Sequence, residues 1–367
     1  MRAGWGTAAV ATLALLLSGC QVAVQGSAGL SAGDRQLADK RAQQRAAVDT
    51  ALTALEQAPA LAYGSTLPGG DQQWRVTRGG SAVGVLPIEG QPVQVAMAAG
   101  QLYLAATPEY WKARGADDGV QFGTGWVRSA PSELPLDPAG RLVPAKVAAG
   151  LRTAVATMDQ VREPVRAKLP DGTEVYEVGT GLGKLRVTTA QPNRVVSFAP
   201  ALLDQRAGAK FGTELRVEPI TGEALKKFHG DLDAAIGAIG RPLDALARAS
   251  VTVVGDKLDC KDYDGTCKTT VDLTSSVVGG GQGTSVHVLL TVEVSADSLG
   301  AQTCKAEGDA APDAPLTLAC DVRFQLPNRT ASYRVLAKPT AVGEVRVPVD
   351  AEKTKQAVQA DFATIGG

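Results

Sequence analysis

The sequence predicts an α+β protein: an antiparallel sheet packed on helices, followed by a strand-rich C-terminal module clamped by disulfides. Three observations predict this class. Short runs of alternating apolar residues are separated by turn residues, and the chain holds 41 Gly and 20 Pro in 367 residues. A few longer segments carry apolar residues at helical spacing. Four of the five cysteines lie in the last third of the chain, at Cys260, Cys267, Cys304 and Cys320.

Length and charge limit the classes of protein that fit. A single core rarely grows past about 250–300 residues, so a chain of 367 residues is expected to form two domains. The 37 Lys and Arg nearly balance the 38 Asp and Glu, and a net charge of -1 gives no electrostatic basis for binding nucleic acid. The chain has only two histidines, which argues against a histidine-rich metal site. We therefore expect no nucleic-acid partner, no metal and no cofactor.

The first 19 residues have the order of a lipoprotein signal peptide. Arg2 supplies a positive charge, and the apolar run 8–17 is shorter than the roughly 20 residues that cross a bilayer. The following Leu17-Ser18-Gly19-Cys20 resembles the bacterial lipobox, an aliphatic residue and two small residues before a cysteine. The resemblance implies that the Cys20 sulfur takes a diacylglycerol and that cleavage leaves Cys20 as the mature N-terminus. An ordinary secretory signal with an incidental cysteine is the alternative.

The small and polar residues that follow are expected to form a flexible tether over 20–33. Two acyl chains on Cys20 would satisfy the two-signal requirement for stable membrane attachment. No later apolar run is long enough to span a bilayer. The sequence thus predicts a folded body on the extracytoplasmic face of a bacterial cell membrane, held there by its lipid anchor.

The predicted first module, residues 34–217, begins with a helix and continues as a meander. The helix covers 34–57, with one apolar face made of Leu37, Val48, Leu52 and Leu55. Alternating residues and turn signals then predict strands over 60–66, 73–77, 82–88, 93–97 and 102–105. Thr107 precedes a short helix over 108–114, and a second long helix is predicted over 144–158. Three more strands are expected over 173–178, 184–189 and 194–199.

The predicted second module, residues 218–367, begins with the clearest helix of the chain, over 221–239. Its apolar stripe consists of Leu225, Phe228, Leu232, Ile236 and Ile239. A short helix is predicted over 243–250, and a closing helix over 350–362. Between these two helices the pattern predicts strands over 251–254, 267–273, 285–294, 316–324, 332–336 and 344–347.

The four cysteines of the second module are interpreted as disulfides, because an exported chain with an even set commonly pairs them. Three pairings are possible. Proximity in sequence favours Cys260 with Cys267 and Cys304 with Cys320, each clamping a loop between strands. A zinc site is the competing interpretation, but the cysteines lack paired C-x₂-C spacing.

The first module carries a motif that resembles a known family. The motif runs from Gln101-Leu102-Tyr103-Leu104 through Tyr110-Trp111 to Gly125-Trp126-Val127. It resembles a unit of actinobacterial cell-envelope lipoproteins related to the LolA-like and LppX/LprG-type glycolipid carriers. The resemblance covers roughly half the chain. It implies a curved antiparallel sheet, a half-barrel, that wraps over helices and encloses an apolar cavity for acyl chains.

Patterns for catalysis are missing from the sequence. The segment 179–184 has neither the Walker spacing nor a Ser or Thr after its Lys, and we expect a turn between strands. No S-x-x-K occurs, and the spacing of His229 and His287 suggests no Ser-His-Asp set. We therefore predict no catalytic residues and a protein that is not an enzyme.

The leading functional hypothesis is a membrane-anchored binder or carrier of a lipid, a glycolipid or another amphipathic envelope molecule. The candidate lining residues are Val93, Val95, Met97, Leu102, Leu104, Val147, Leu151 and Val155. The same residues would also serve as an ordinary filled core. The alternative is a structural or interaction lipoprotein that presents its disulfide-clamped module to a protein or cell-wall partner. A filled first module with exposed apolar residues on the second would favour this alternative.

Overall fold

A computed structural model describes residues 31–67, 70–88, 91–114, 125–134, 136–156, 165–207, 213–327 and 331–363. The predicted signal peptide, Cys20 and positions 21–30 of the predicted tether lie outside these residues. The chain divides into two compact units, 1–42 and 43–367. No helix in the described ranges combines the length and the apolar character needed to cross a bilayer.

The first described element is helix α1 (Ala32–Gln57), which begins two residues earlier than the sequence predicts and shortens the predicted tether. In the first unit its side chains are exposed, including Leu37, which was expected on the apolar face. In the second unit the helix becomes amphipathic, and Val48, Leu52 and Leu55 are buried as predicted. The turns before residue 43 bury no side chain, whereas the later turns pack their apolar face into a core.

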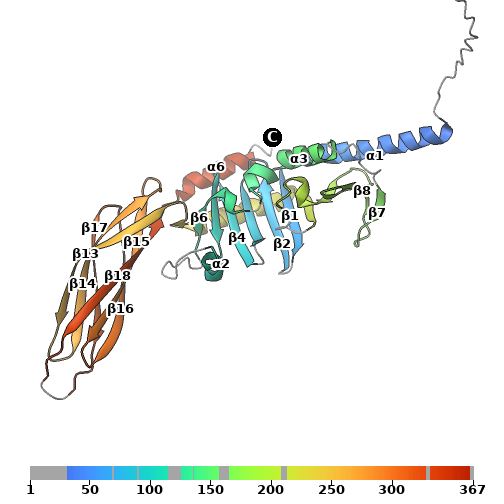
Figure 1. The fold of residues 1–367 in the computed structure, drawn as a ribbon. Helices are drawn as coiled ribbons and strands as arrows, with labels where there is room; N and C mark the ends of the chain where they lie inside the picture. Colours follow the sequence, from blue (N-terminus) through green and yellow to red (C-terminus); the bar gives the residue numbers. More distant parts are fainter. Residues whose placement is uncertain are drawn as a thin grey trace, which may run out of the picture. The chain divides into compact units, whose positions relative to one another are not determined.

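The predicted meander is confirmed (Figure 1). Its strands are β1 (Ala60–Leu67), β2 (Gly70–Thr77), β3 (Ala82–Ile88), β4 (Gln91–Ala98), β5 (Gln101–Ala105) and β6 (Val127–Ser129). On the β1 side the sheet continues through β11 (Leu215–Ile220), β10 (Val195–Phe198), β9 (Gly183–Thr188), β8 (Glu174–Thr180) and β7 (Val165–Lys168). The short helix α2 (Pro108–Lys112) follows β5, and the main-chain N–H of Tyr110 donates to the Thr107 hydroxyl 3.4 Å away.

The two faces of this sheet carry side chains of different size. Large apolar residues such as Tyr63, Trp74 and Leu104 lie on one face, in a single cluster with α1 and α3 (Pro144–Ala156). Because successive strand residues point to opposite faces, the other face receives the small residues between them. These small residues include Ala60, Ala62, Ala96 and Ala98.

Two helices from the predicted second module cover the small-residue face. In α5 (Gly222–Ile239), Phe228 contacts Ala60, and Leu232 and Ile236 lie in a cluster with Ala98. The same cluster includes Val358 of α6 (Ala351–Ala363). Alanine side chains leave room for both helices to approach the strands, so these helices complete the first module although they belong to the second half of the sequence.

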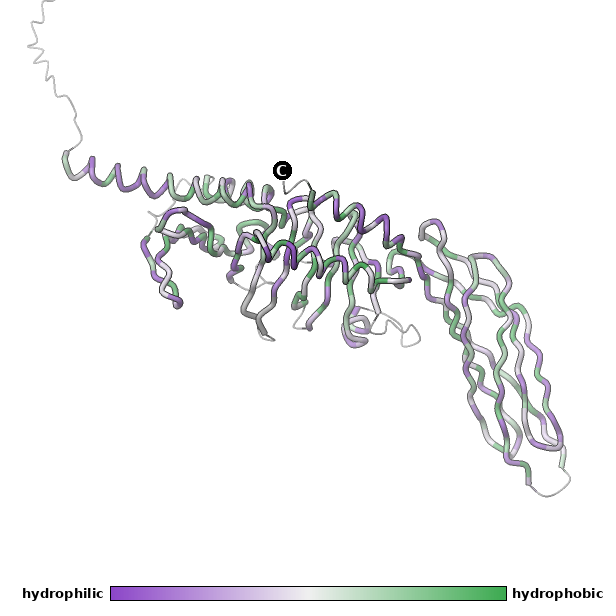
Figure 2. The backbone as a smooth tube through the Cα atoms, turned by 180° about the vertical axis from the view of Figure 1, so that it is seen from behind, coloured by the Kyte–Doolittle hydropathy of each residue, from purple (hydrophilic) through white to green (hydrophobic). Residues whose placement is uncertain are grey.

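The C-terminal strands form a sandwich of two sheets. One sheet is β13 (Arg248–Cys260), β14 (Thr266–Val278) and β17 (Pro315–Arg323). The facing strands are β18 (Val335–Arg346), β15 (Ser285–Ala296) and β16 (Gly300–Ala310). Apolar and polar residues alternate along these strands, as the changing colours in Figure 2 show. The inward residues form one core, so the fold class predicted for both modules is confirmed.

Two strand predictions in this region were wrong. The segments 332–336 and 344–347 were expected as separate strands, whereas one strand, β18 (Val335–Arg346), overlaps both and includes Pro339. At Pro339 this strand pairs with β15 on one edge and with no strand on its other edge. A proline, which lacks an N–H, is tolerated at such an edge position. Two further strands were not predicted: β16, whose residues are mostly small or polar, and β11, although its apolar Leu215 and Val217 alternate with charged residues.

The predicted helix 243–250 is also wrong, because this segment forms β12 (Leu243–Asp244) and the start of β13. β12 pairs in parallel with β6 and antiparallel with β18, which joins the meander and one layer of the sandwich into a 15-stranded sheet. The Asp244 carboxylate accepts hydrogen bonds from Arg128 Nε at 3.0 Å, Arg128 Nη2 at 2.6 Å and Leu246 N at 3.0 Å. Long-range pairing therefore overrides the local helix propensity of this alanine- and leucine-rich segment.

We predict that Asp244→Asn lowers the free energy of unfolding by about 3 kcal/mol, because it leaves the Arg128 guanidinium without a buried counter-charge. The Asp244 side chain is 0% exposed. Glu223→Gln is the matched control, since Glu223 meets Lys226 at the same 2.6 Å but the two side chains are 87% and 76% exposed. Its cost should stay within about 0.5 kcal/mol. Urea unfolding of both variants checks the prediction, and equal costs would contradict it.

Candidate functional site

The predicted ligand-lining residues come together, but they do so as part of a buried core. Residues of β4, β5 and α3 supply them, and all but the partly buried Val155 are buried. They are Val93, Val95, Met97, Leu102, Leu104, Val147, Leu151 and Val155. None of them lines either of the two cavities described below. Lipid binding between this sheet and its helices stays a prediction.

The predicted disulfide pairing is confirmed. Cys260 and Cys267 lie directly opposite each other on β13 and β14, within one sheet. Cys304 and Cys320 join β16 to β17 and therefore connect the two sheets of the sandwich. Two disulfides fit an extracytoplasmic location, because the cytosol keeps most thiols reduced.

Both disulfides lie toward the same end of the sandwich, which we call the distal tip. The tip comprises the loop 261–265, the turn 297–299 and the described residues of the 324–334 connection. β18 spans 12 residues from the tip to its pairing with β12, a length of about 40 Å. The tip is thus the end of the sandwich that lies away from β12.

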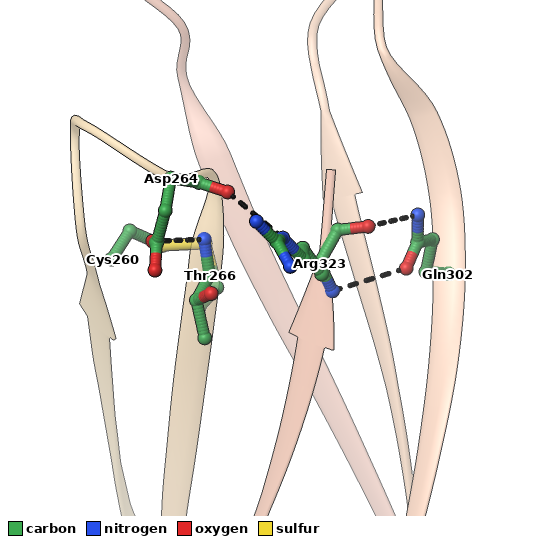
Figure 3. The surroundings of a disulfide bond; sticks show 6 residues. Cys260, Asp264, Thr266, Gln302 and Arg323 are labelled. Carbon is green, nitrogen blue, oxygen red and sulfur yellow. Dashed lines mark hydrogen bonds between the residues drawn. A yellow bond between two sulfur atoms is a disulfide. The ribbon is translucent and has the colours of Figure 1, made fainter. Parts of the chain in front are cut away.

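Side chains lock the loop of the distal tip in place (Figure 3). The Thr266 N–H donates to Asp264 Oδ1 at 3.0 Å, and Arg323 Nε donates to the Asp264 carbonyl at 3.2 Å. The Gln302 amide then pairs with the main chain of Arg323. Its Nε2 donates to the carbonyl at 2.7 Å, and its Oε1 accepts from the N–H at 3.2 Å. Gln302 thus supplies a strand-like link between β16 and β17, which belong to different sheets.

The Asp264 carboxylate is held in its charged form. Its main-chain hydrogen bond with Thr266 lowers the pKa of Asp264, and the positive charges of Lys261 and Arg323 lower it further. The sequence contains no local signal for these contacts, because Gln302 and Arg323 are brought to Asp264 only by the sandwich.

The rigid tip exposes apolar side chains. Tyr263 is 76% exposed, with the Lys261 ammonium 5.8 Å from its ring centroid. Leu326 and Leu336 are also exposed. Leu326 lies beside the loop, since a Cβ placed on Gly265 would stand 3.1 Å from its Cγ. An exposed aromatic ring on a constrained loop is a typical anchor for a protein partner. The signal for it in the sequence is a tyrosine between acidic residues in a loop closed by two cysteines.

A cleft of about 420 Å³ lies on the first sheet, along β1, β10 and β11. Its charged lining residues are Asp171, Arg194, Arg216 and Glu218. A second cavity, of about 850 Å³, lies beside β12 among residues that include Glu133, Leu246 and Arg248. Neither cavity has a signal in the sequence, because each combines residues from distant parts of the chain.

An ion-pair network lies on β8, β9 and the residue before β11. Arg186 meets Glu177 at 3.1 Å and Glu214 at 2.5 Å, and Lys184 also reaches Glu177. Burial alone would raise the pKa of both glutamates. At Glu177, hydrogen bonds from Lys184 and Arg186 lower the pKa more than burial raises it. At Glu214, hydrogen bonds from Arg186 and Ser197 do the same. Both pKa values are therefore lowered.

The two histidines occupy structural positions. His229 packs its ring on Phe362, with 4.5 Å between the centroids. His287 is buried, and its Nδ1 lies 3.1 Å from Asp309 Oδ1. Within the described ranges, no group of three or more His, Cys, Asp or Glu side chains is arranged to hold a metal ion.

Comparisons with known proteins add little to this geometry. No protein-family model matches the sequence, and no curated protein matches it. Among solved structures, the chain is similar to one in a crystal structure of MucB in complex with MucA(peri), at 10% identity and a TM-score of 0.23. The match covers 86% of this chain and 97% of that chain. At this TM-score, neither the fold nor the function of that chain transfers to this one.

We predict that removing the disulfides destabilises the protein unequally. By the loop-entropy relation, Cys304→Ser with Cys320→Ser should cost about 3 kcal/mol and Cys260→Ser with Cys267→Ser about 2 kcal/mol. The reason is that the first pair closes a separation of 16 residues and the second a separation of 7. Urea unfolding of both double variants measures the costs. A larger cost for the shorter loop would contradict the prediction.

We also predict that the contribution of Arg186 to the free energy of unfolding depends on pH. The folded pKa values of Glu177 and Glu214 lie below the unfolded value of about 4.3. The network therefore stabilises fully above that pH, and the stabilisation is lost as pH falls through the folded pKa values. The stability difference between the wild-type protein and Arg186→Gln should shrink in acid, as measured by urea unfolding at several pH values. The control Lys305→Gln removes an exposed charge and should give a nearly constant difference.

Proposed function

We propose that this protein is a non-enzymatic, lipid-anchored binding protein of the cell envelope that presents the distal tip to a protein partner. The observation that carries the proposal is the exposed Tyr263 on a loop fixed by a disulfide, by Asp264 and by Arg323. The lipid anchor on Cys20 rests on the lipobox, and the carrier-family resemblance rests on the motif in the first module.

The rigidity of the tip supports binding through it. A flexible loop loses conformational entropy when it binds, about 0.5–1.5 kcal/mol for each side chain that becomes fixed. The Cys260–Cys267 bond and the Gln302–Arg323 pairing fix the main chain around Tyr263 before any partner arrives. Tyrosine then offers a large contact area with few rotatable bonds, which makes it a frequent hot spot in interfaces.

The packing of the first module also favours a protein partner over a lipid ligand. Its candidate lining residues fill a core, whereas Tyr263, Leu326 and Leu336 are exposed at the distal tip, among other exposed apolar residues of both modules. A protein partner is therefore the leading candidate ligand.

A lipid or glycolipid ligand in the first module is the second candidate. The observation that favours it is the extent of the apolar cluster between the sheet and the helices α1 and α3, which separation of the layers would open to acyl chains. Native mass spectrometry of the protein purified from a lipid-rich host tests this function. A co-purified species of lipid mass would support it. Delipidated protein that extracts no lipid from membranes would argue against it.

We predict that a photo-crosslinker at position 262 forms a discrete adduct with one envelope protein in intact cells. Asp262 is exposed next to Tyr263, so the substitution leaves the proposed anchor in place. Tyr263→Ala in the same chain should strongly reduce the adduct. With the purified partner, Tyr263→Ala should raise the Kd about 30-fold, a loss of about 2 kcal/mol that is typical of a hot spot.

Two matched variants make this experiment decisive. The same crosslinker at Lys353, an exposed residue of α6, should give no adduct with that protein. Gln302→Ala removes the clamp but leaves Tyr263 in place, so it should weaken binding by a smaller factor. An adduct that is unchanged by Tyr263→Ala, or that forms equally at position 353, would overturn the proposed function.

A further inference from the structure

The 420 Å³ cleft on the first sheet exists because small residues lie at its centre. Ala62 and Gly64 are neighbours on one face of β1. Gln73 on β2 and Arg216 on β11 pair with Gly64, and Glu218 on β11 pairs with Ala62. Long side chains thus stand around two positions with almost no side chain, which leaves a hollow above the strands.

Helix α5 does not fill this hollow. Its contact with β1 and β11 is made by Phe228, in a cluster with Ala60 and Ile220 against which Ala62 also packs. The next residues of both strands, toward Gly64 and Arg216, line the open cleft instead. The remaining wall comes from Asp171 and Thr173 around the start of β8 and from Arg194 before β10.

The charged groups of the cleft attract one another at a distance: in addition to the hydrogen bonds with Thr173, the positive charge of Arg216 helps to lower the pKa of Asp171. Within the described ranges, the side chains of Arg194, Arg216 and Glu218 form no hydrogen bond or ion pair. The fourth charged group, Asp171, already accepts a hydrogen bond from the Thr173 N–H at 2.9 Å. The cleft therefore offers two guanidinium groups and two carboxylates, a balance of charge that fits a zwitterion better than a simple anion.

We propose that this cleft binds a small zwitterion whose phosphate contacts Arg194 and Arg216 and whose ammonium contacts Glu218. Each guanidinium carries five N–H donors in a planar fork that matches phosphate oxygens. The carboxylate selects a ligand with a positive group near the phosphate. The volume lies within the range of about 300–1,000 Å³ that is usual for small-molecule sites. Both a free phosphate zwitterion and the headgroup of an ethanolamine phospholipid have this chemistry.

Ligand-observed NMR titration of the full-length protein with phosphoethanolamine tests the proposal. We expect saturable binding with a Kd of about 1 mM or tighter, weakened at least about tenfold by Arg216→Gln. The control Lys305→Gln removes one exposed positive charge from β16 and should leave the Kd unchanged. Absence of saturation at about 20 mM ligand, or equal binding by Arg216→Gln, would overturn the proposal.

Inorganic phosphate provides a sharper test, because it lacks the ammonium. Glu218→Gln should weaken binding of phosphoethanolamine at least about fivefold, because the ammonium loses its counter-charge. The same variant should bind inorganic phosphate with an unchanged or lower Kd, because a negative charge has been removed. An equal loss for both probes would overturn the role of Glu218 and with it the proposed ligand class.

The source of the ligand is decided by a third probe. Dihexanoyl phosphatidylethanolamine, kept below its critical micelle concentration, carries the same headgroup on a monomeric lipid. Tighter binding than phosphoethanolamine would assign the site to a lipid headgroup, and equal or weaker binding would assign it to a free solute. Tyr263→Ala should leave all three titrations unchanged. The proposal for this cleft and the proposed function of the distal tip can therefore be disproved independently.

Discussion

The ion pair between Arg128 and Asp244 fixes the place where the strands of the first module become continuous with the sandwich. β12 contains only two residues, so few main-chain hydrogen bonds hold it between β6 and β18. Three hydrogen bonds to one buried carboxylate reinforce this short strand, two of them from a charged donor. Through β18, the ladder then extends to β15 and β16. The continuity of the large sheet therefore depends on this contact.

A second constraint is that the meander is apolar on both faces, whereas an antiparallel sheet commonly leaves one face to solvent. Large residues on one face pack with α1 and α3, and alanines on the other allow α5 and α6 to approach. The same use of small residues continues past Ala62, which still packs against the α5 cluster, to Gly64 in the cleft. Small strand residues thus let the helices approach the sheet and, farther along the strands, leave the cleft open.

Local periodicity explains why much of the fold could be predicted from the sequence. The stripe from Leu225 to Ile239 predicts α5, alternation predicts β1 to β5, and sequence proximity predicts both disulfides. β12 and the cleft share a physical cause of failure, since both arise from residues that are distant in the sequence. β12 is a strand only because β6 and β18 lie beside it. The cleft likewise requires positions 62–64 to pair with positions 216–218.

The two ends of the sandwich are stabilised by different means, and the difference bears on function. At β12 the contacts are non-covalent and buried, which suits a structural connection. At the distal tip the core gives way to loops, and disulfides together with the Gln302–Arg323 pairing replace the missing burial. Covalent restraint around an exposed tyrosine lowers the entropy that binding would otherwise cost. The same restraint stabilises the end of the sandwich whether or not a partner binds, so its structural role and the proposed binding role are compatible.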